Sequence, residues 1–372
     1  MRTSKRFTSL AAVAALGLLA VACGSDSKSE TTTAPAASAG ATTSGTEATG
    51  TTPTGTEATG TAAAPGSSDV TAGVAFDTGG RGDGTFNDSA GRGLDQAVSE
   101  LGVKKIELEA VKDEDRKTNL ELLAQQKANP VIAVGFAFTD PLTAVAAANP
   151  DTTFAIVDSV VDAPNVRSLV FAEHEGSFLV GAAAALKSKT GHIGFIGGQE
   201  IDLIKKFEAG YIAGAKAVNP DIKIDSKYLG PAGDNSAWGN VAGAKEIAKG
   251  WYDAGADVIY TAAGGSGAGT IQAAVEADKW AIGVDSDQYL LAKPDEQKHI
   301  LTSMLKHVDV SVFQTIKAVA DGDTKGGIIT FDLKSDGVGY STSGGFLDDV
   351  KDKLDAYKAD IISGKIVVPT KP

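Results

Sequence analysis

Short β-branched runs alternate with helical stretches along most of this chain, and this alternation constrains the fold more than any other feature. Strands are expected at 70–76, 105–110, 131–135, 153–157 and 167–171, separated by helical patterns at 88–101, 115–128, 140–149 and 175–189. A second series has strands at 192–196, 222–227, 257–261 and 281–284 and helices at 201–218, 236–254 and 268–278. Strands that alternate with helices form parallel sheets through right-handed crossovers. The pattern therefore predicts an α/β protein with two doubly wound, Rossmann-like lobes.

The last segment, 299–372, is expected to connect the two lobes. It contains a helical pattern at 307–321, a hairpin-like pair at 327–332 and 338–341, and a closing helix at 347–363. The simplest interpretation is that this segment crosses back between the lobes and forms hinge strands. The expected lobes are then 69–190 plus about 305–325, and 191–304 plus about 326–372. Because ligands bind beyond the carboxyl ends of parallel strands, we expect the site in a cleft between the lobes.

The first residues have the pattern of an export signal. A basic stretch precedes an apolar run that ends at Ala22 and is too short to span a bilayer, so 1–22 is expected to be a signal peptide. The run ends in "LAVAC", which resembles a bacterial lipobox, although Ala20 stands where leucine is commoner. Cys23 is the only cysteine and cannot form an internal disulfide. Acylation is its expected use, and an ordinary secretory signal is the alternative.

Residues 23–68 are expected to form a disordered stalk. Beyond Cys23 this segment is rich in Thr, Ala, Gly and Ser, has no aromatic residue, and repeats "GTEATG" at 45–50 and 55–60. Such a composition cannot bury enough apolar surface to offset the entropy of the chain. A ligand-binding repeat is the alternative.

The charge of the chain limits its partners. The formal net charge is −13, and removing the three basic residues of the signal leaves −13 − 3 = −16. An acidic surface of this kind argues against nucleic acid or anionic lipid as a partner. We therefore expect no nucleic-acid partner.

Several side chains suited to ligand binding follow the expected strands or open the next helices. They are Asp77, Phe86, Asn87 and Asp140 in the first series, and Phe207, Gly264, Gly265 and Asp285 in the second. Each has a structural alternative when taken singly. Asp140 before Pro141 is a good helix N-cap, and a lone phenylalanine is more often a core residue. Their convergence on one predicted cleft favours a binding site.

The glycine-rich loops make an enzyme the competing hypothesis. "AGGSGAG", followed by a helix and then Asp285, mimics a dinucleotide fingerprint. However, neither loop contains G-x-G-x-x-G in the proper frame, and the chain has no P-loop, G-x-S-x-G, H-E-x-x-H or C-x-x-C motif. The four histidines show no ligand-like spacing. We therefore expect no catalytic residues, no cofactor and no metal.

These strand-end motifs resemble the basic-membrane-protein (BMP, PnrA-like) lipoproteins, which are nucleoside-binding proteins of ABC importers. The similarity is carried by "FDTGGRGDGTFNDSAGRGLDQA" (76–97), "GFAFTDPLTAVAAANPDTTFAIVD" (135–158), "GADVIYTAAGGSGAGTIQAA" (255–274), "IGVDSDQ" (282–288) and the long block at 171–220. It continues in "LTSMLKHVDVSVF" (301–313) and covers nearly all of the folded part. The resemblance implies a type I periplasmic-binding-protein fold with a ligand cleft between two hinged lobes.

The resemblance also implies roles for individual residues. A base would stack between Phe86 and Phe207, while Asp77, Asn87 and Asp140 would contact its edge. Asp285 and Lys306 would hold the ribose hydroxyls beside Gly264 and Gly265. Trp238 lies in a block that departs from the family pattern, "YLGPAGDNSAWGN" (228–240), so it could extend the aromatic sandwich or simply pack.

The resemblance implies a membrane-anchored, extracytoplasmic receptor for a small molecule, with a purine nucleoside as the expected ligand. Its expected partners are the permease and ATPase subunits of an ABC importer, and a monomer is expected. The expected location is the outer face of the cytoplasmic membrane, in a Gram-positive bacterium. The alternatives are the same fold with another ligand, such as a sugar, in transport or sensing, and thirdly a nucleoside-processing enzyme.

Overall fold

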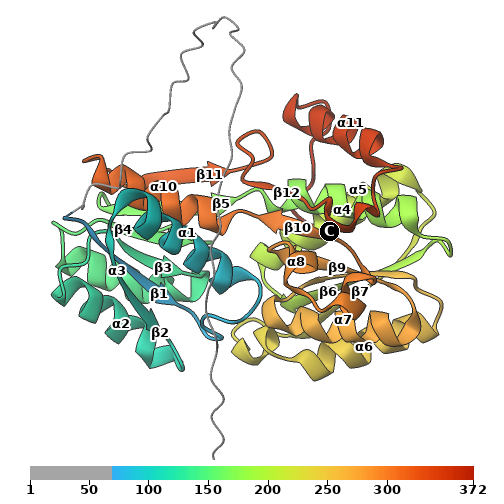
Figure 1. Ribbon diagram of the computed structural model, residues 1–372, viewed down its shortest axis with the longest axis horizontal. Coiled ribbons are helices and arrows are strands. Elements are labelled where there is room, and N and C mark those ends of the chain that lie inside the picture. The colour runs from blue at the N-terminus through green and yellow to red at the C-terminus, as the bar shows by residue number, and fades with distance from the viewer. Residues whose placement is uncertain (1–68) are drawn as a thin grey trace, which may run out of the picture. The chain divides into compact units, whose positions relative to one another are not determined.

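The computed structural model describes residues 69–372, so the expected signal peptide, Cys23 and the expected stalk lie outside the described residues. The first of its two sheets has the order β11-β5-β4-β3-β1-β2, and all neighbours are parallel. Its strands are β1 (Thr71–Phe76), β2 (Lys104–Glu109), β3 (Val131–Val134), β4 (Phe154–Val157), β5 (Val166–Phe171) and β11 (Gly327–Phe331). This sheet and the helices α1 (Phe86–Leu101), α2 (Asp113–Gln125), α3 (Thr139–Ala148) and α10 (Val308–Ala320) form the first lobe (Figure 1).

The second sheet has the order β12-β10-β9-β8-β6-β7 and is parallel except for its edge strand β12. Its strands are β6 (His192–Gln199), β7 (Lys223–Gly230), β8 (Val258–Ala262), β9 (Trp280–Asp285), β10 (Ile300–Lys306) and β12 (Val338–Tyr340). The second lobe also contains α4 (Glu173–Lys187), α5 (Asp202–Val218), α6 (Val241–Asp253), α7 (Gly267–Ala277), α8 (Gln288–Leu291), α9 (Pro294–Gln297) and α11 (Lys351–Ile362). Short 3-10 turns are η1 (Phe136–Phe138), η2 (Asn235–Trp238), η3 (Gly264–Ser266) and η4 (Ser343–Gly345). The expected two-lobed α/β architecture is confirmed.

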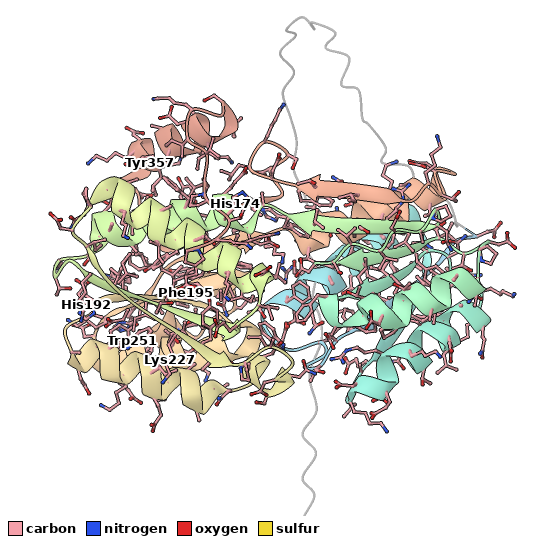
Figure 2. The ribbon with its side chains drawn as sticks, turned by 180° about the vertical axis from the view of Figure 1, so that it is seen from behind. His174, His192, Phe195, Lys227, Trp251 and Tyr357 are labelled. Atoms are coloured by element: carbon pink, nitrogen blue, oxygen red, sulfur yellow. The ribbon has the colours of Figure 1, made fainter. Side chains whose placement is uncertain are left out.

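The central strands of both sheets are buried on both faces, which explains why β3, β4 and β8 are nearly continuous apolar runs, whereas the edge strands β2 and β7 are partly exposed. In β1, Val74 and Phe76 belong to the core under α1, whereas Ala75 belongs to the core under α2 and α3. In β6, Phe195 contacts Tyr211 of α5, with ring centroids 6.1 Å apart, inside the second lobe (Figure 2). Its neighbour Gly194 faces the other way, and a Cβ there would come within 2.6 Å of the Trp251 ring.

Helices α4 and α5 pack closely because glycines face the opposite backbone. A Cβ at Gly210 would lie 2.1 Å from the His174 carbonyl oxygen, and one at Gly214 would lie 1.9 Å from that of Phe178. Helix α4 therefore belongs to the second lobe, although we expected residues 175–189 in the first. The apolar pattern of α4 predicted a helix but could not show which sheet it covers.

The expected hairpin at 327–332 and 338–341 is wrong. β11 pairs with β5 in the first sheet, and β12 pairs with β10 in the second. The chain consequently crosses between the lobes three times, at Ala172, at His307 and through 332–337. The expected hinge role of the last segment agrees with these crossings, but the lobe boundaries differ from those expected, because β11 lies in the first lobe.

Candidate functional site

A cavity of about 390 Å³ lies where the carboxyl ends of strands from both sheets meet. This volume is within the roughly 300–1,000 Å³ typical of small-molecule sites. The first lobe lines it with Asp77, Thr78, Gly79, Asp83, Phe86, Asn87, Gly135, Phe136 and Asp158. The second lobe lines it with Leu203, Ile204, Phe207, Asn235, Ser236, Trp238, Gly239, Ala262, Ala263, Gly264, Gly265, Val284, Asp285 and Lys306.

The cavity brings together most of the residues singled out in the sequence. Its lining includes Asp77, Phe86, Asn87, Phe207, Trp238, Gly264, Gly265, Asp285 and Lys306, and their contact with a ligand stays a prediction. Asp140 is not among the lining residues, and it is exposed in the first turn of α3. The turn η1 takes up three residues between β3 and α3, so Gly135 and Phe136 reach the cavity instead.

The glycine-rich loop after β1 leads into α1 and is held in one backbone conformation by its glycines and by ion pairs. Gly79, Gly80, Gly82 and Gly84 all have positive φ values, between 54° and 103°, which side chains with a Cβ rarely adopt. Arg81 anchors the loop through ion pairs of 2.7 Å to Glu107 and 2.8 Å to Asp95. The loop therefore folds back onto β2 and α1 of its own lobe.

Asp83 organises the first turn of α1. Its carboxylate accepts hydrogen bonds from the backbone N–H groups of Thr85, Asn87 and Asp88, at 2.9, 2.9 and 3.1 Å. These are donors that the start of a helix leaves without a partner in the helix. Because the turn is fixed in this way, Phe86 and Asn87 are held against the cavity.

Asp77 is held by a buried arginine. Arg116, whose side chain is only 5% exposed, places Nε at 2.8 Å and Nη2 at 2.7 Å from Asp77 Oδ1. The backbone N–H of Thr78 donates to the same oxygen at 2.7 Å. Asp77 Oδ1 is therefore engaged by the protein, and the arginine fixes the carboxylate at the cavity wall.

Lys306, at the end of β10, lies in a buried ionic cluster between the lobes. Its Nζ is 2.7 Å from Asp158 Oδ2 and 3.3 Å from Glu173 Oε1. The side chains of Lys306, Asp158 and Glu173 are 2%, 5% and 0% exposed. Burial alone would lower the pKa of Lys306, but the charges of the nearby carboxylates raise it, so the lysine is a cation.

Two phenylalanines from different lobes flank the same ammonium group. Lys306 Nζ lies 5.3 Å from the centroid of the Phe86 ring and 5.5 Å from that of Phe207. These distances are within the range of cation–π attraction. The rings are therefore placed around the Lys306 end of the cavity, one on α1 and one on α5.

Asp158 and Asp285 share an uncommon backbone conformation at the ends of β4 and β9. Their φ values are 68° and 62°, in the left-handed region that residues with a Cβ seldom adopt. Such strained residues cluster at functional sites. Burial raises the pKa of Asp285 to about 7, against the opposing charge of Lys306.

The cavity is rich in hydrogen-bond acceptors. Four carboxylates line it, those of Asp77, Asp83, Asp158 and Asp285, against one lysine that is already paired. Asn87 Oδ1 and Asp158 Oδ1 are buried without a hydrogen-bond partner among residues 69–372. A ligand that donates hydrogen bonds suits these atoms, whereas a phosphate would find no cation in the cavity lining that is not already paired with a carboxylate.

Asp158 and Glu173 are the main residues that the sequence analysis missed. Asp158 directly follows β4, so the strand-end reasoning applied to the other strands would have found it. Glu173 begins α4 and reaches Lys306 only through tertiary structure, and no local signal in the sequence marks it.

Comparisons with known proteins agree with this architecture. A family model described as "ABC transporter substrate-binding protein PnrA-like" (Bmp) matches residues 70–371. The "ABC transporter nucleoside-binding protein BmpA" of Lactococcus lactis is 39% identical over 323 residues, which cover 82% of this chain and 90% of that protein. A protein of Pyrococcus abyssi, named as an uncharacterized lipoprotein, is 37% identical over 73% of this chain and 69% of its own length.

A solved structure of a solute-binding protein has the same fold. The crystal structure of an ABC transporter solute-binding protein from Aeropyrum pernix has a TM-score of 0.69 and 28% identity, and the match covers 81% of this chain and 94% of that one. The type I periplasmic-binding-protein fold is thus confirmed. The chain belongs to the Bmp, PnrA-like family of ABC transporter substrate-binding proteins.

Proposed function

We propose that this protein binds a purine nucleoside in the cavity between its lobes and presents it to an ABC importer. The single observation that carries the proposal is the placement of Phe86 and Phe207, from opposite lobes, around one acceptor-rich cavity. Aromatic rings that stack on a base contribute about 1–3 kcal/mol per base and tolerate different bases. The name of the Lactococcus lactis relative, a nucleoside-binding protein, supports the same ligand class.

In this proposal the base lies between the two phenyl rings. Asp77 and Asn87, on the first lobe, accept hydrogen bonds from its edge. The ribose lies toward Lys306, where Asp158 and Asp285 accept from its hydroxyls and Lys306 donates to them. Hydrogen bonds that involve a charged partner are the stronger ones, so a vicinal diol gains most at this end of the cavity.

The protein acts as a receptor and releases its ligand unchanged. Its relatives are solute-binding proteins, and the buried Lys306 is engaged by two carboxylates and is therefore poorly suited to nucleophilic attack. Hinge closure around a ligand is a common switch in such two-lobed proteins. The permease would then recognise the closed form.

A ligand panel tests this proposal through the melting temperature. At a concentration of about 100 times Kd, a ligand stabilises the folded chain by about 2.7 kcal/mol. Inosine, guanosine and adenosine are expected to raise the melting temperature by several degrees, whereas ribose and the 5′-monophosphates do not. A shift with ribose or another pentose alone would reject a nucleoside ligand, and conversion of a nucleoside, seen by chromatography, would reject a receptor role.

We further propose that Cys23 carries a lipid that anchors the chain outside the cytoplasmic membrane. The lipobox-like "LAVAC" and the relative named as a lipoprotein support this, and paired acyl chains give stable attachment. Within residues 69–372, no helix is long and apolar enough to cross a membrane. In a lipoprotein-processing bacterium supplied with radiolabelled palmitate, the wild-type chain is expected to incorporate the label and the Cys23→Ser chain is not. A wild-type chain without label would contradict the anchor.

A further inference from the structure

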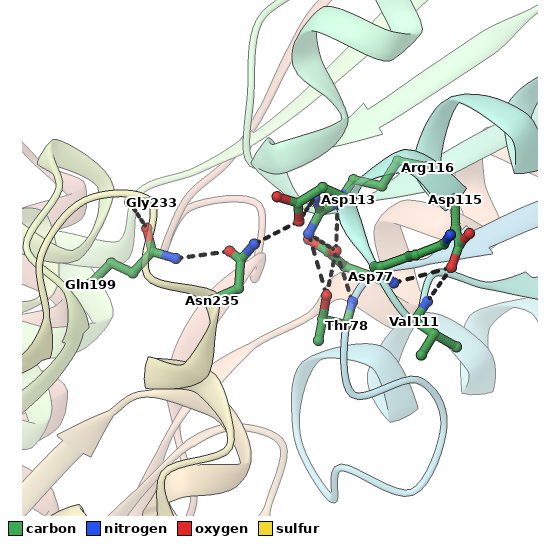
Figure 3. Close-up of polar contacts among 10 residues, drawn as sticks. Asp77, Thr78, Val111, Asp113, Asp115, Arg116, Gln199, Gly233 and Asn235 are labelled. Atoms are coloured by element: carbon green, nitrogen blue, oxygen red, sulfur yellow. Dashed lines mark hydrogen bonds and ion pairs between the residues drawn. The ribbon is translucent and has the colours of Figure 1, made fainter.

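A chain of hydrogen bonds crosses the mouth of the cleft from the second lobe to the first (Figure 3). The backbone N–H of Gly233 donates to Gln199 Oε1 at 2.8 Å, and Gln199 Nε2 donates to Asn235 Oδ1 at 3.1 Å. Asn235 Nδ2 then donates to Asp113 Oδ1 at 2.9 Å. Gly233, Gln199 and Asn235 belong to the second lobe, and Asp113 begins α2 in the first.

On the first lobe the same chain continues to the cavity wall. Arg116 Nη1 donates to Asp113 Oδ1 at 2.7 Å. The other nitrogens of that guanidinium hold Asp77 Oδ1, as described above. Asn235 is thus connected to Asp77, a predicted ligand contact, through Asp113 and Arg116.

One link in this chain depends on how closely the lobes approach. The bonds of Gln199 lie within the second lobe, and those of Arg116 lie within the first. Only the bond from Asn235 to Asp113, among these links, joins the two lobes. The Asp113 side chain is 72% exposed, so water would hydrate its carboxylate readily if the lobes separated.

Asn235 is not needed to cap its own turn. In η2 the side chain of Asp234 accepts from the backbone N–H of Ser236 and provides the cap. The side-chain amide of Asn235 is therefore available to the other lobe. Gln199 donates to Asn235 Oδ1 and so orients the amide with Asn235 Nδ2 toward Asp113. Nearby, the ring of Trp238 meets Phe136 of the first lobe edge-on, at 6.2 Å.

We propose that Asn235 is a closure latch, and that Asp113 and Arg116 couple this latch to the orientation of Asp77. The role as a ligand receptor rests on the proposed function above. When the lobes close, the Asn235 amide donates a hydrogen bond to the Asp113 carboxylate. Asp113 then holds Arg116, and Arg116 holds Asp77 in its ligand-binding position. Asn235, Asp113 and Arg116 are positioning residues in this scheme.

Removal of the latch is expected to speed ligand release. A hydrogen bond of this type contributes about 0.5–1.5 kcal/mol net, so Asn235→Ala and Asp113→Ala should each raise the inosine release rate about three- to tenfold. The association rate should change less than twofold, because the latch forms after the ligand has entered. Stopped-flow Trp fluorescence measures both rates, since Trp238 lines the cavity and reports on it directly.

Two further variants separate a latch from a general structural effect. Glu121→Gln changes another exposed carboxylate of α2 that pairs within its own helix, with Lys117, and should release inosine at the wild-type rate. The double variant Asp113→Asn/Asn235→Asp exchanges donor and acceptor, so it should release inosine more slowly than Asn235→Asp alone, which places like charges across the cleft. Unchanged release in Asn235→Ala, or full additivity of Asn235→Ala with Asp113→Ala, would overturn the latch.

Failure of the proposed ligand would not be confused with failure of the latch. If the wild-type chain binds no nucleoside in the panel, the proposed function is wrong and the latch is judged by small-angle scattering without ligand. The Asn235→Asp variant places like charges across the cleft and should have a larger radius of gyration than the wild type. Identical scattering profiles would overturn the latch.

Discussion

Replacement of Lys306 with methionine is expected to lower the free energy of unfolding by about 3–5 kcal/mol, because it leaves the buried Asp158 carboxylate without its cation. Asp158 and Glu173 are almost fully buried, and Lys306 lies within 3.3 Å of both. The variant is also expected to lose nucleoside binding, since Lys306 lines the cavity. Urea denaturation followed by circular dichroism measures the first effect, and calorimetric titration measures the second.

Lys206→Met provides the matched control. Lys206 Nζ lies 3.2 Å from Glu173 Oε2, so this lysine pairs with the same carboxylate. Its side chain is 31% exposed, however, and solvent replaces part of what it contributes. We expect a loss of at most about 1 kcal/mol from this change. Equal stability of the Lys306→Met and Lys206→Met chains would contradict the larger contribution to stability that we assign to Lys306.

Phe86→Ala is expected to weaken nucleoside binding about 10- to 100-fold, because it removes one stacking surface worth about 1–3 kcal/mol. Phe86 is half-buried, so its loss should cost little stability. Phe207 is 3% exposed and belongs to the core of its lobe. Phe207→Ala should therefore weaken binding to a similar degree and also destabilise the chain, by about 3 kcal/mol or more.

Two measurements test the Phe86→Ala and Phe207→Ala predictions: calorimetric titration with inosine gives the affinity, and urea denaturation gives the stability. Phe346→Ala is the control, because Phe346 is also half-buried but packs against Trp280 and Tyr289, away from the cavity. It should lose some stability and keep its affinity for inosine. If Phe86→Ala loses stability like a core residue and keeps its affinity, the stacking role of Phe86 is wrong.

Much of the fold could be predicted from the sequence because most strands are buried apolar runs bounded by turn residues. The runs of β1 and β3 show this plainly. β10 was missed because Thr302 and Ser303 interrupt its apolar pattern. In the structure Thr302 Oγ1 donates to the Ser341 carbonyl oxygen at 2.6 Å, and Ser303 Oγ accepts from the Gln288 N–H at 3.1 Å. A polar residue can be buried when it has such a partner, but the partners lie 39 and 15 residues away.

The candidate site, like the fold, could be predicted from the sequence only where a local pattern marks it. The rule that ligands bind at strand ends led to Asp77 and Asp285, and both line the cavity. Lys306 came from the family resemblance, and its environment could not be predicted, because it pairs with Asp158 across 148 residues of chain. Asp140 was expected at the cavity but does not line it, because η1 separates it from the end of β3.

Trp238 was left open between a ligand contact and a packing role. It lines the cavity and also packs edge-on against Phe136 across the cleft. Its ring occupies the space beside Gly198, where a Cβ would lie 2.2 Å from the indole. Gly198, which leaves this space because it has no side chain, belongs to β6. The position of Trp238 therefore depends on a contact that the local sequence does not reveal.

The most direct test of the central claim is a calorimetric titration of the wild-type chain with inosine and, separately, with inosine 5′-monophosphate. The cavity contains four carboxylates and one lysine that is already paired. We therefore predict that inosine binds at a ratio of one per chain, whereas the monophosphate binds at least 100-fold more weakly. Equal or tighter binding of the monophosphate, or no heat of binding with inosine, guanosine and adenosine alike, would contradict a nucleoside receptor.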